Sequence, residues 1–146
     1  MKKAIFISLI LGVVLLIGCV KDTSNKLYDE LVAGLEKDGL AVEKEKVEDT
    51  GGGFLKGEEK RLKLGEDEFI YVYLYKNDEA MSKDIEGLSP DGFSYDNGES
   101  EIAVEWRYQP HYYEQENMIV IYVGQNQKTL DSLERILGAP FIGVME

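Results

Sequence analysis

Apolar positions recur along this chain with two different spacings, and each spacing predicts a kind of secondary structure. Three segments place apolar side chains one helical turn apart and end at a glycine or a turn signal, which is typical of amphipathic helices. The residue before the first turn of each segment has a side-chain oxygen that can accept a hydrogen bond from a free backbone N–H. The expected helices run over residues 25–38, 78–88 and 127–137, with Ser24, Asn77 and Asn126 as their N-caps.

Other segments alternate between apolar and polar residues, which predicts strands. The strongest is 68–75, where tyrosines share one face and Ile70, Val72 and Leu74 share the other. Residues 118–123 are apolar throughout, which favours an inner strand covered on both faces. Weaker candidates are a charged edge strand at 41–47, strands at 60–64 and 101–109, and a short strand at 93–95, with 110–117 as a connector.

The order of these elements predicts the fold class. After an N-terminal helix, a strand-strand-helix unit occurs twice, although its two copies share no clear residue identity. Strands joined by short turns pair in antiparallel fashion. We therefore expect an α+β fold, with helices packed on one face of an antiparallel sheet and residues 25–146 forming a single domain. The pattern does not specify the strand order.

The first 18 residues show neither the helical nor the alternating spacing of apolar residues. Lys2 and Lys3 precede an apolar run from Ala4 to Gly18, broken only by Ser8, which is the pattern of a secretory signal. As a helix this run reaches only about 22 Å, against a bilayer core of about 30 Å, so a permanent span is disfavoured. We expect residues 1–18 to be a signal peptide that is removed.

The end of this run, Leu16-Ile17-Gly18-Cys19, resembles the lipobox of bacterial lipoproteins. The resemblance implies cleavage between Gly18 and Cys19, a diacylglycerol on the Cys19 thiol, and fatty acyl chains such as palmitate that hold the protein on the extracytoplasmic face of the cell membrane. Cys19 is the only cysteine, so lipidation also accounts for an unpaired thiol in an exported chain. Residues 19–24 are then a short lipidated tether. The alternative is an ordinary signal peptide, or a short membrane anchor, with an incidental cysteine.

Charge narrows the classes of partner. The full chain has a net charge of −12, and removal of residues 1–18, which hold two lysines and no acids, takes it to −14. Nucleic-acid binding needs a basic surface, so we exclude that class. The acidity suits solubility, cationic partners or divalent ions, and a solvated acidic surface is the simplest interpretation.

Candidate chemistry is sparse. His111 is the only histidine, and no Gly-x-Ser-x-Gly motif accompanies it. One histidine and no free cysteine disfavour a zinc site, and the acidic stretches 66–68 and 96–99 do not match a calcium-binding loop. The triglycine at 51–53 lacks the lysine and the helix of a phosphate-binding loop and is expected to be a hinge. We therefore predict no catalytic residue, no metal site and no cofactor.

Aromatic residues are the most distinctive binding candidates. His111, Tyr112 and Tyr113 follow Pro110 in the expected connector, where exposed side chains suit contact with a protein or a glycan. Trp106 lies nearby and completes this candidate surface, although on the expected strand 101–109 it would face the core. The alternative is a loop that folds down over the edge of the sheet.

A wider resemblance covers most of the chain. Trp106, the stretches 110–113 and 119–124, and the segment Leu133-Glu134-Arg135-Ile136-Leu137-Gly138 resemble small uncharacterised lipoproteins of spore-forming Gram-positive bacteria. Such proteins are described only as lipoproteins, so the resemblance implies anchoring and no catalytic role.

Three functional classes follow. The first is a binding or accessory domain close to the membrane, with a membrane or cell-wall protein as its partner and a compact inhibitor or immunity protein as a variant. The second is an extracytoplasmic enzyme, which no motif supports. The third is the substrate receptor of an importer, for which the mature chain is too short to form two closing domains.

Overall fold

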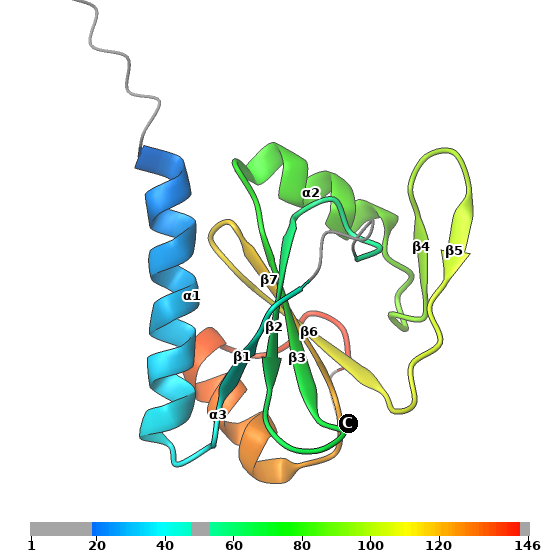
Figure 1. The fold of residues 1–146 in the computed structure, drawn as a ribbon. Coiled ribbons are helices and arrows are strands. Elements are labelled where there is room, and N and C mark those ends of the chain that lie inside the picture. Colours follow the sequence, from blue (N-terminus) through cyan, green and yellow to red (C-terminus); the bar gives the residue numbers. More distant parts are fainter. Residues whose placement is uncertain (1–18, 48–52, 144–146) are drawn as a thin grey trace, which may run out of the picture.

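A five-stranded antiparallel sheet with helices on it forms the centre of the molecule (Figure 1). The computed structural model describes residues 19–47 and 53–143. The expected signal peptide and most of the expected triglycine hinge therefore lie outside the described residues. The helices in the described part are α1 (Cys19–Lys37), α2 (Asp78–Gly87) and α3 (Gln127–Leu137). The strands there are β1 (Glu43–Glu45), β2 (Glu58–Lys63), β3 (Phe69–Leu74), β4 (Ser94–Asp96), β5 (Glu101–Ala103), β6 (Pro110–Gln115) and β7 (Met118–Val123).

The strand order of the main sheet is β1-β2-β3-β7-β6, and every neighbouring pair is antiparallel. The apolar strand β7 lies between β3 and β6, as expected for an inner strand, and Val72 pairs with Val120 at its centre. The charged strand β1 lies at one edge, also as expected. Charged side chains at an edge discourage further strands from pairing there. The α+β class, the antiparallel sheet and the N-terminal helix are thus confirmed.

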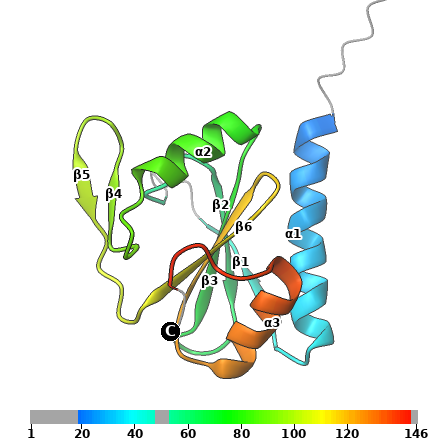
Figure 2. The same ribbon diagram turned by 180° about the vertical axis from the view of Figure 1, so that it is seen from behind.

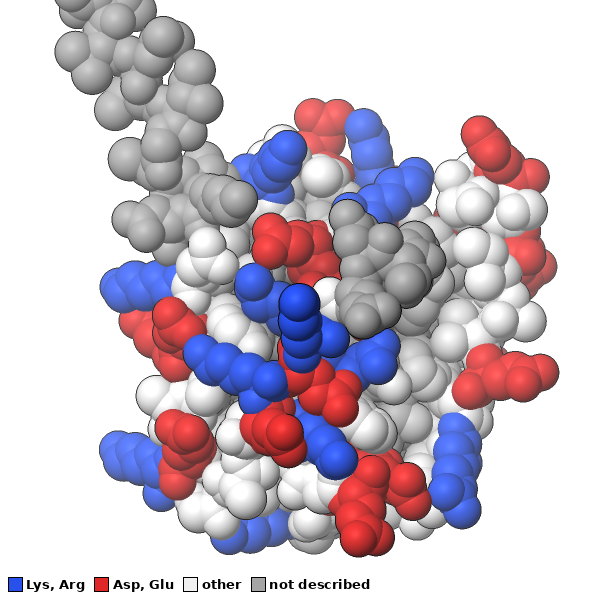
Figure 3. Space-filling view, in the orientation of Figure 1, with Lys and Arg blue, Asp and Glu red and all other residues white. Residues whose placement is uncertain are grey.

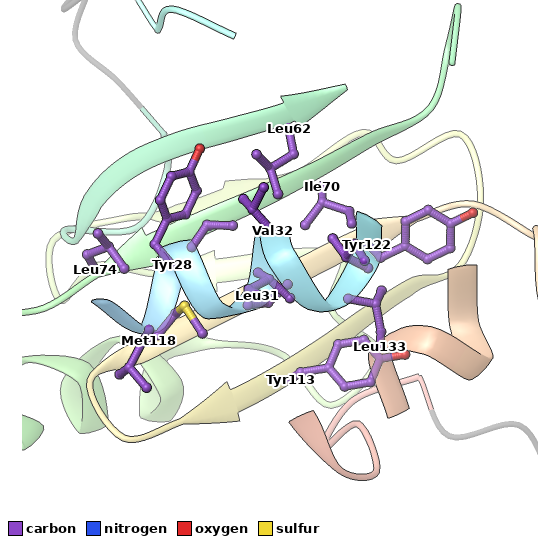
Figure 4. Close-up of a cluster of buried hydrophobic side chains, with 14 of the residues drawn as sticks. Tyr28, Leu31, Val32, Leu62, Ile70, Leu74, Tyr113, Met118, Tyr122 and Leu133 are labelled. Carbon is purple, nitrogen blue, oxygen red and sulfur yellow. The ribbon is translucent and has the colours of Figure 1, made fainter. Parts of the chain in front are cut away.

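One face of the sheet is covered by α1 and α3 (Figures 1 and 2). Figure 4 shows side chains of α1 lying between those of the strands, with Leu133 of α3 beside Tyr113 of β6. Leu31 and Leu35 of α1 are 1% and 0% exposed. The two helices are also joined at the surface, where the guanidinium of Arg135 donates to Asp38 at 2.6 Å and lowers the pKa of that carboxyl. The N-terminal helix is therefore part of the core and not a stem.

The opposite face of the sheet has a second, tyrosine-rich core. Because side chains alternate along a strand, Tyr73 of β3 points into it while Val72 points toward α1. Met81 of α2 and Tyr95 of β4 lie in this second core. The two strand-strand-helix units, β2-β3-α2 and β6-β7-α3, are both present, but their helices pack against opposite faces.

The predicted helix caps of α2 and α3 are confirmed. The side chain of Asn77 accepts a hydrogen bond from the backbone of Ala80 at 2.9 Å, and Asn126 accepts one from Lys128 at 3.1 Å. The expected short strand near residue 94 is also present, as β4. Among the described strands β4 pairs with β5, while Tyr95 also bridges Leu88 after α2, and this hairpin forms a separate arm beside the main sheet (Figure 1).

The segment 101–117 differs from the expectation. Only Glu101–Ala103 is a strand there, residues 104–109 are irregular, and the expected connector instead contains the edge strand β6. β6 joins β7 through a two-residue turn in which Glu116 has φ 49°. This turn contains no glycine, the residue that usually marks a tight hairpin, so the sequence pattern does not predict it.

Candidate functional site

The amino-terminal end of α1, which begins at Cys19, is the candidate functional site that the sequence singled out. The Oγ of Ser24 donates to the backbone carbonyl of Tyr75 at 3.2 Å, at the end of β3. The backbone N–H of Tyr75 donates to the carbonyl of Asn117 at 2.9 Å, in the β6–β7 turn. These hydrogen bonds fix α1 to two other segments only five residues after Cys19.

The structure differs from the expected tether at 19–24. α1 already includes these residues, and Ser24 lies inside the helix, with 4% of its surface exposed, where an N-cap was expected. The hydroxyl of Ser24 donates to a backbone carbonyl of another segment, and in this position it does not serve as an N-cap. The connection between Cys19 and the domain is therefore helical.

The expected exposure of the residues around His111 is wrong. His111, Tyr112 and Tyr113 belong to β6 and are 4%, 0% and 1% exposed. Tyr113 points toward α1 and α3, while Tyr112 points into the tyrosine-rich core. Burial lowers the pKa of His111, whose ring stacks on that of Tyr122 with centroids 6.4 Å apart. These side chains stabilise the fold and form no contact surface.

Trp106 is half-buried and lies in the irregular segment that follows β5. Its indole N–H donates to the carbonyl of Gly92 at 3.0 Å, and its ring centre is 5.5 Å from that of Tyr71 and 5.9 Å from that of Phe54. The tryptophan therefore ties this segment to the sheet. The indole N–H also contacts the hydroxyl of Tyr112 at 3.4 Å, so the structure brings Trp106 and Tyr112 together, but Tyr112 is fully buried and the pair forms no exposed site.

A buried carboxylate that the sequence analysis missed lies on α2. Asp84 is 0% exposed, and one of its oxygens accepts from the hydroxyl of Tyr95 at 2.7 Å. Its other oxygen accepts from the hydroxyl of Tyr75 at 2.8 Å and from the backbone N–H of Lys56 at 2.6 Å. Asp84 is thus the common partner of β3, β4 and the loop before β2. A signal did exist, because Asp84 lies three residues after Met81, on the inward face of α2.

The Asp84 cluster joins three segments of the fold through hydrogen bonds. Burial and the neighbouring carboxylate both raise the pKa of Tyr75 and of Tyr95, so both phenols stay protonated at neutral pH. A similar pair ties α3 to the sheet, where Glu68 accepts from Tyr122 at 2.7 Å and from Thr129 at 2.8 Å. These carboxylates are occupied by hydroxyl donors.

Two other kinds of site to consider are a metal centre and a surface pocket. In residues 19–47 and 53–143, no three histidine, cysteine or acidic side chains are grouped as metal ligands would be. A shallow, open hollow of about 350 Å³ lies where the segment after α1 meets the β2–β3 turn. Its lining residues are Ala41, Val42, Glu43, Lys63, Leu64, Gly65 and Glu66.

Two further findings bear on function. Within the described part of the chain, no helix is both long enough and apolar enough to cross a bilayer. Comparisons with models of protein families, with curated proteins and with solved structures found no match to this chain.

Proposed function

We propose that this protein is a lipid-anchored extracytoplasmic domain that acts close to the membrane as a binding or accessory module. The observation that carries the proposal is that the chain is already helical at Cys19, the residue expected to bear the lipid, and that this helix is packed into the core from Ser24 onward. A lipid at Cys19 would therefore hold the folded domain directly, without a flexible linker.

The sequence supports the anchor independently of the fold. Lys2 and Lys3, the apolar run 4–18 and the lipobox ending in Cys19 occur in the order that export and lipidation require. Each buried methylene contributes about 0.8 kcal/mol, and two acyl chains anchor a protein stably where one chain does not. Membrane association would then come from lipid alone.

The occupied carboxylates support a binding or accessory role over catalysis. A general acid or base must be free to reach a substrate. Asp84 and Glu68 instead accept hydrogen bonds from two hydroxyls each. The partner of such a module would be a membrane or cell-wall protein, and a compact inhibitor or immunity protein falls within the same proposal.

Fractionation of Gram-positive cells that express residues 1–146 tests the anchor. We expect wild type to partition into the detergent phase of a membrane extract, and Cys19→Ser to appear in the medium or to remain unprocessed. Thr23→Ser introduces the same residue four positions later and should behave as wild type. If Cys19→Ser both partitions into detergent and has the mass of the wild-type membrane form, apart from the substitution itself, the proposal is wrong.

A further inference from the structure

We infer that the domain stands on the membrane with one defined end toward the lipid headgroups. This end comprises Ser24 of α1, Tyr75 and Lys76 after β3, and the β6–β7 turn at Asn117. The opposite end, with the β2–β3 turn at Glu66, faces away from the bilayer. The inference rests on the proposed lipid anchor at Cys19, and it names the surface that meets the membrane.

Cys19 and Ser24 lie close together along α1. Ser24 is the fifth residue after Cys19, a rise of about 7.5 Å at 1.5 Å per residue. The headgroup layer on one side of a bilayer is about 5–7 Å thick. Ser24 is hydrogen-bonded to Tyr75, and Tyr75 to Asn117, so all three are held at the lipid-bearing end of the helix. Figures 1 and 2 show α2 and the start of α1 at the same end of the molecule.

The end of the molecule that holds the β2–β3 turn lies far from Cys19. From Ser24 to Lys37, α1 rises by about 20 Å. The chain then turns back, and the Nζ of Lys128 donates to the carbonyl of Gly39 at 2.9 Å. Residues 41–43, which follow, border the same hollow as Glu66. The β2–β3 turn therefore lies a full helix length from the anchored end.

Two matched cysteine variants test this orientation. Lys76→Cys and Glu66→Cys replace exposed charged residues just beyond the two ends of β3. Because a lipidated Cys19 has no free thiol, each variant offers one thiol to a fluorescent label. The labelled lipoproteins are reconstituted in vesicles of phosphatidylcholine and phosphatidylglycerol that contain a headgroup spin label. We expect quenching at position 76 to be at least threefold stronger than at position 66.

Flotation of the same vesicles separates the two proposals. Protein that floats with the lipid and is quenched equally at both positions, or more strongly at 66, overturns the orientation and leaves the anchor intact. Protein that extracts without lipid and does not float overturns the anchor and the orientation together.

Discussion

Asp84 is the residue on which the second core depends most. A buried carboxylate without partners is costly, whereas hydrogen bonds to a charged group contribute about 1.5–3 kcal/mol each. Asp84 has three donors, from Tyr75, Tyr95 and the backbone of Lys56. It therefore links α2, the hairpin arm and the loop before β2 at one point.

Replacing Asp84 by asparagine should destabilise the protein by about 1.5–3 kcal/mol, because the amide keeps the shape but loses the charge that three donors share. Chemical denaturation followed by circular dichroism measures the change. Asp131→Asn, an exposed change of the same kind on α3, should stay within about 0.5 kcal/mol of wild type. Coincident unfolding curves for Asp84→Asn and wild type would contradict the account.

His111 gives the protein a pH dependence of known sign. Burial lowers its pKa below the ordinary value of 6.5, so the unfolded chain binds a proton that the folded chain resists. Stability from this residue is present above about pH 6.5 and is lost as the pH falls through the folded-state pKa. We expect the free energy of unfolding to fall less between pH 7 and pH 5 in His111→Gln than in wild type. Parallel pH profiles would show that His111 is not buried in its neutral form.

At the scale of elements, α1 is the clearest case of tertiary packing that determines a segment's role. Leu31 is 1% exposed and lies against both β3 and β7 in Figure 4. Truncation of a buried leucine removes transfer free energy and leaves a cavity. If α1 were only a stem, truncation of Leu31 would change the free energy of unfolding very little.

Leu31→Ala should accordingly lower the free energy of unfolding by about 3 kcal/mol. Glu30→Ala changes the adjacent, exposed position and should lower it by no more than about 0.5 kcal/mol. Thermal or urea unfolding of both variants makes the comparison. Equal, small effects would mean that α1 does not pack on the sheet.

Elements with local signals could be predicted from the sequence. Asn77 and Asn126 stand directly before their apolar stripes, and residues 118–123 are long enough and apolar enough to require burial on both faces. The strand β6 could not be predicted in this way. It begins at Pro110, and it is defined by pairing across a turn that contains no glycine. The alternation at 104–109 does not produce a strand, because Trp106 is held through its side chain, by the carbonyl of Gly92 and the hydroxyl of Tyr112, and not through backbone pairing.

The sequence analysis could address only sites that are contiguous in sequence. The expected lipobox ending at Cys19 is of this kind, and it stays a prediction. Asp84 has partners at positions 56, 75 and 95, and only the folded topology brings them together. The burial of Tyr112 and Tyr113 is likewise a consequence of sheet pairing with β7. Such non-local contacts leave no pattern that a single sequence displays.

At the scale of the whole molecule, the two ends differ in what holds them. One end is fixed by the bonds from Ser24 to Tyr75 and from Tyr75 to Asn117, close to Cys19. At the other end, the side chains of Lys128 and Arg135 on α3 tie down the end of α1. Figure 3 shows mixed charges over β1 and β2 and acids along the hairpin arm. If Cys19 bears the proposed lipid, the first of these ends lies toward the bilayer and the second toward solvent.

Intact-mass spectrometry of the protein extracted from membranes tests the central claim most directly. We expect a chain that starts at Cys19 and has the added mass of a diacylglyceryl group, with or without a further acyl chain on its amine. Alkaline hydrolysis should release the two ester-linked acyl chains as fatty acids and leave the glyceryl thioether, and any amide-linked acyl chain, on the protein. A chain that retains residues 1–18, or that starts elsewhere without added lipid, would contradict it.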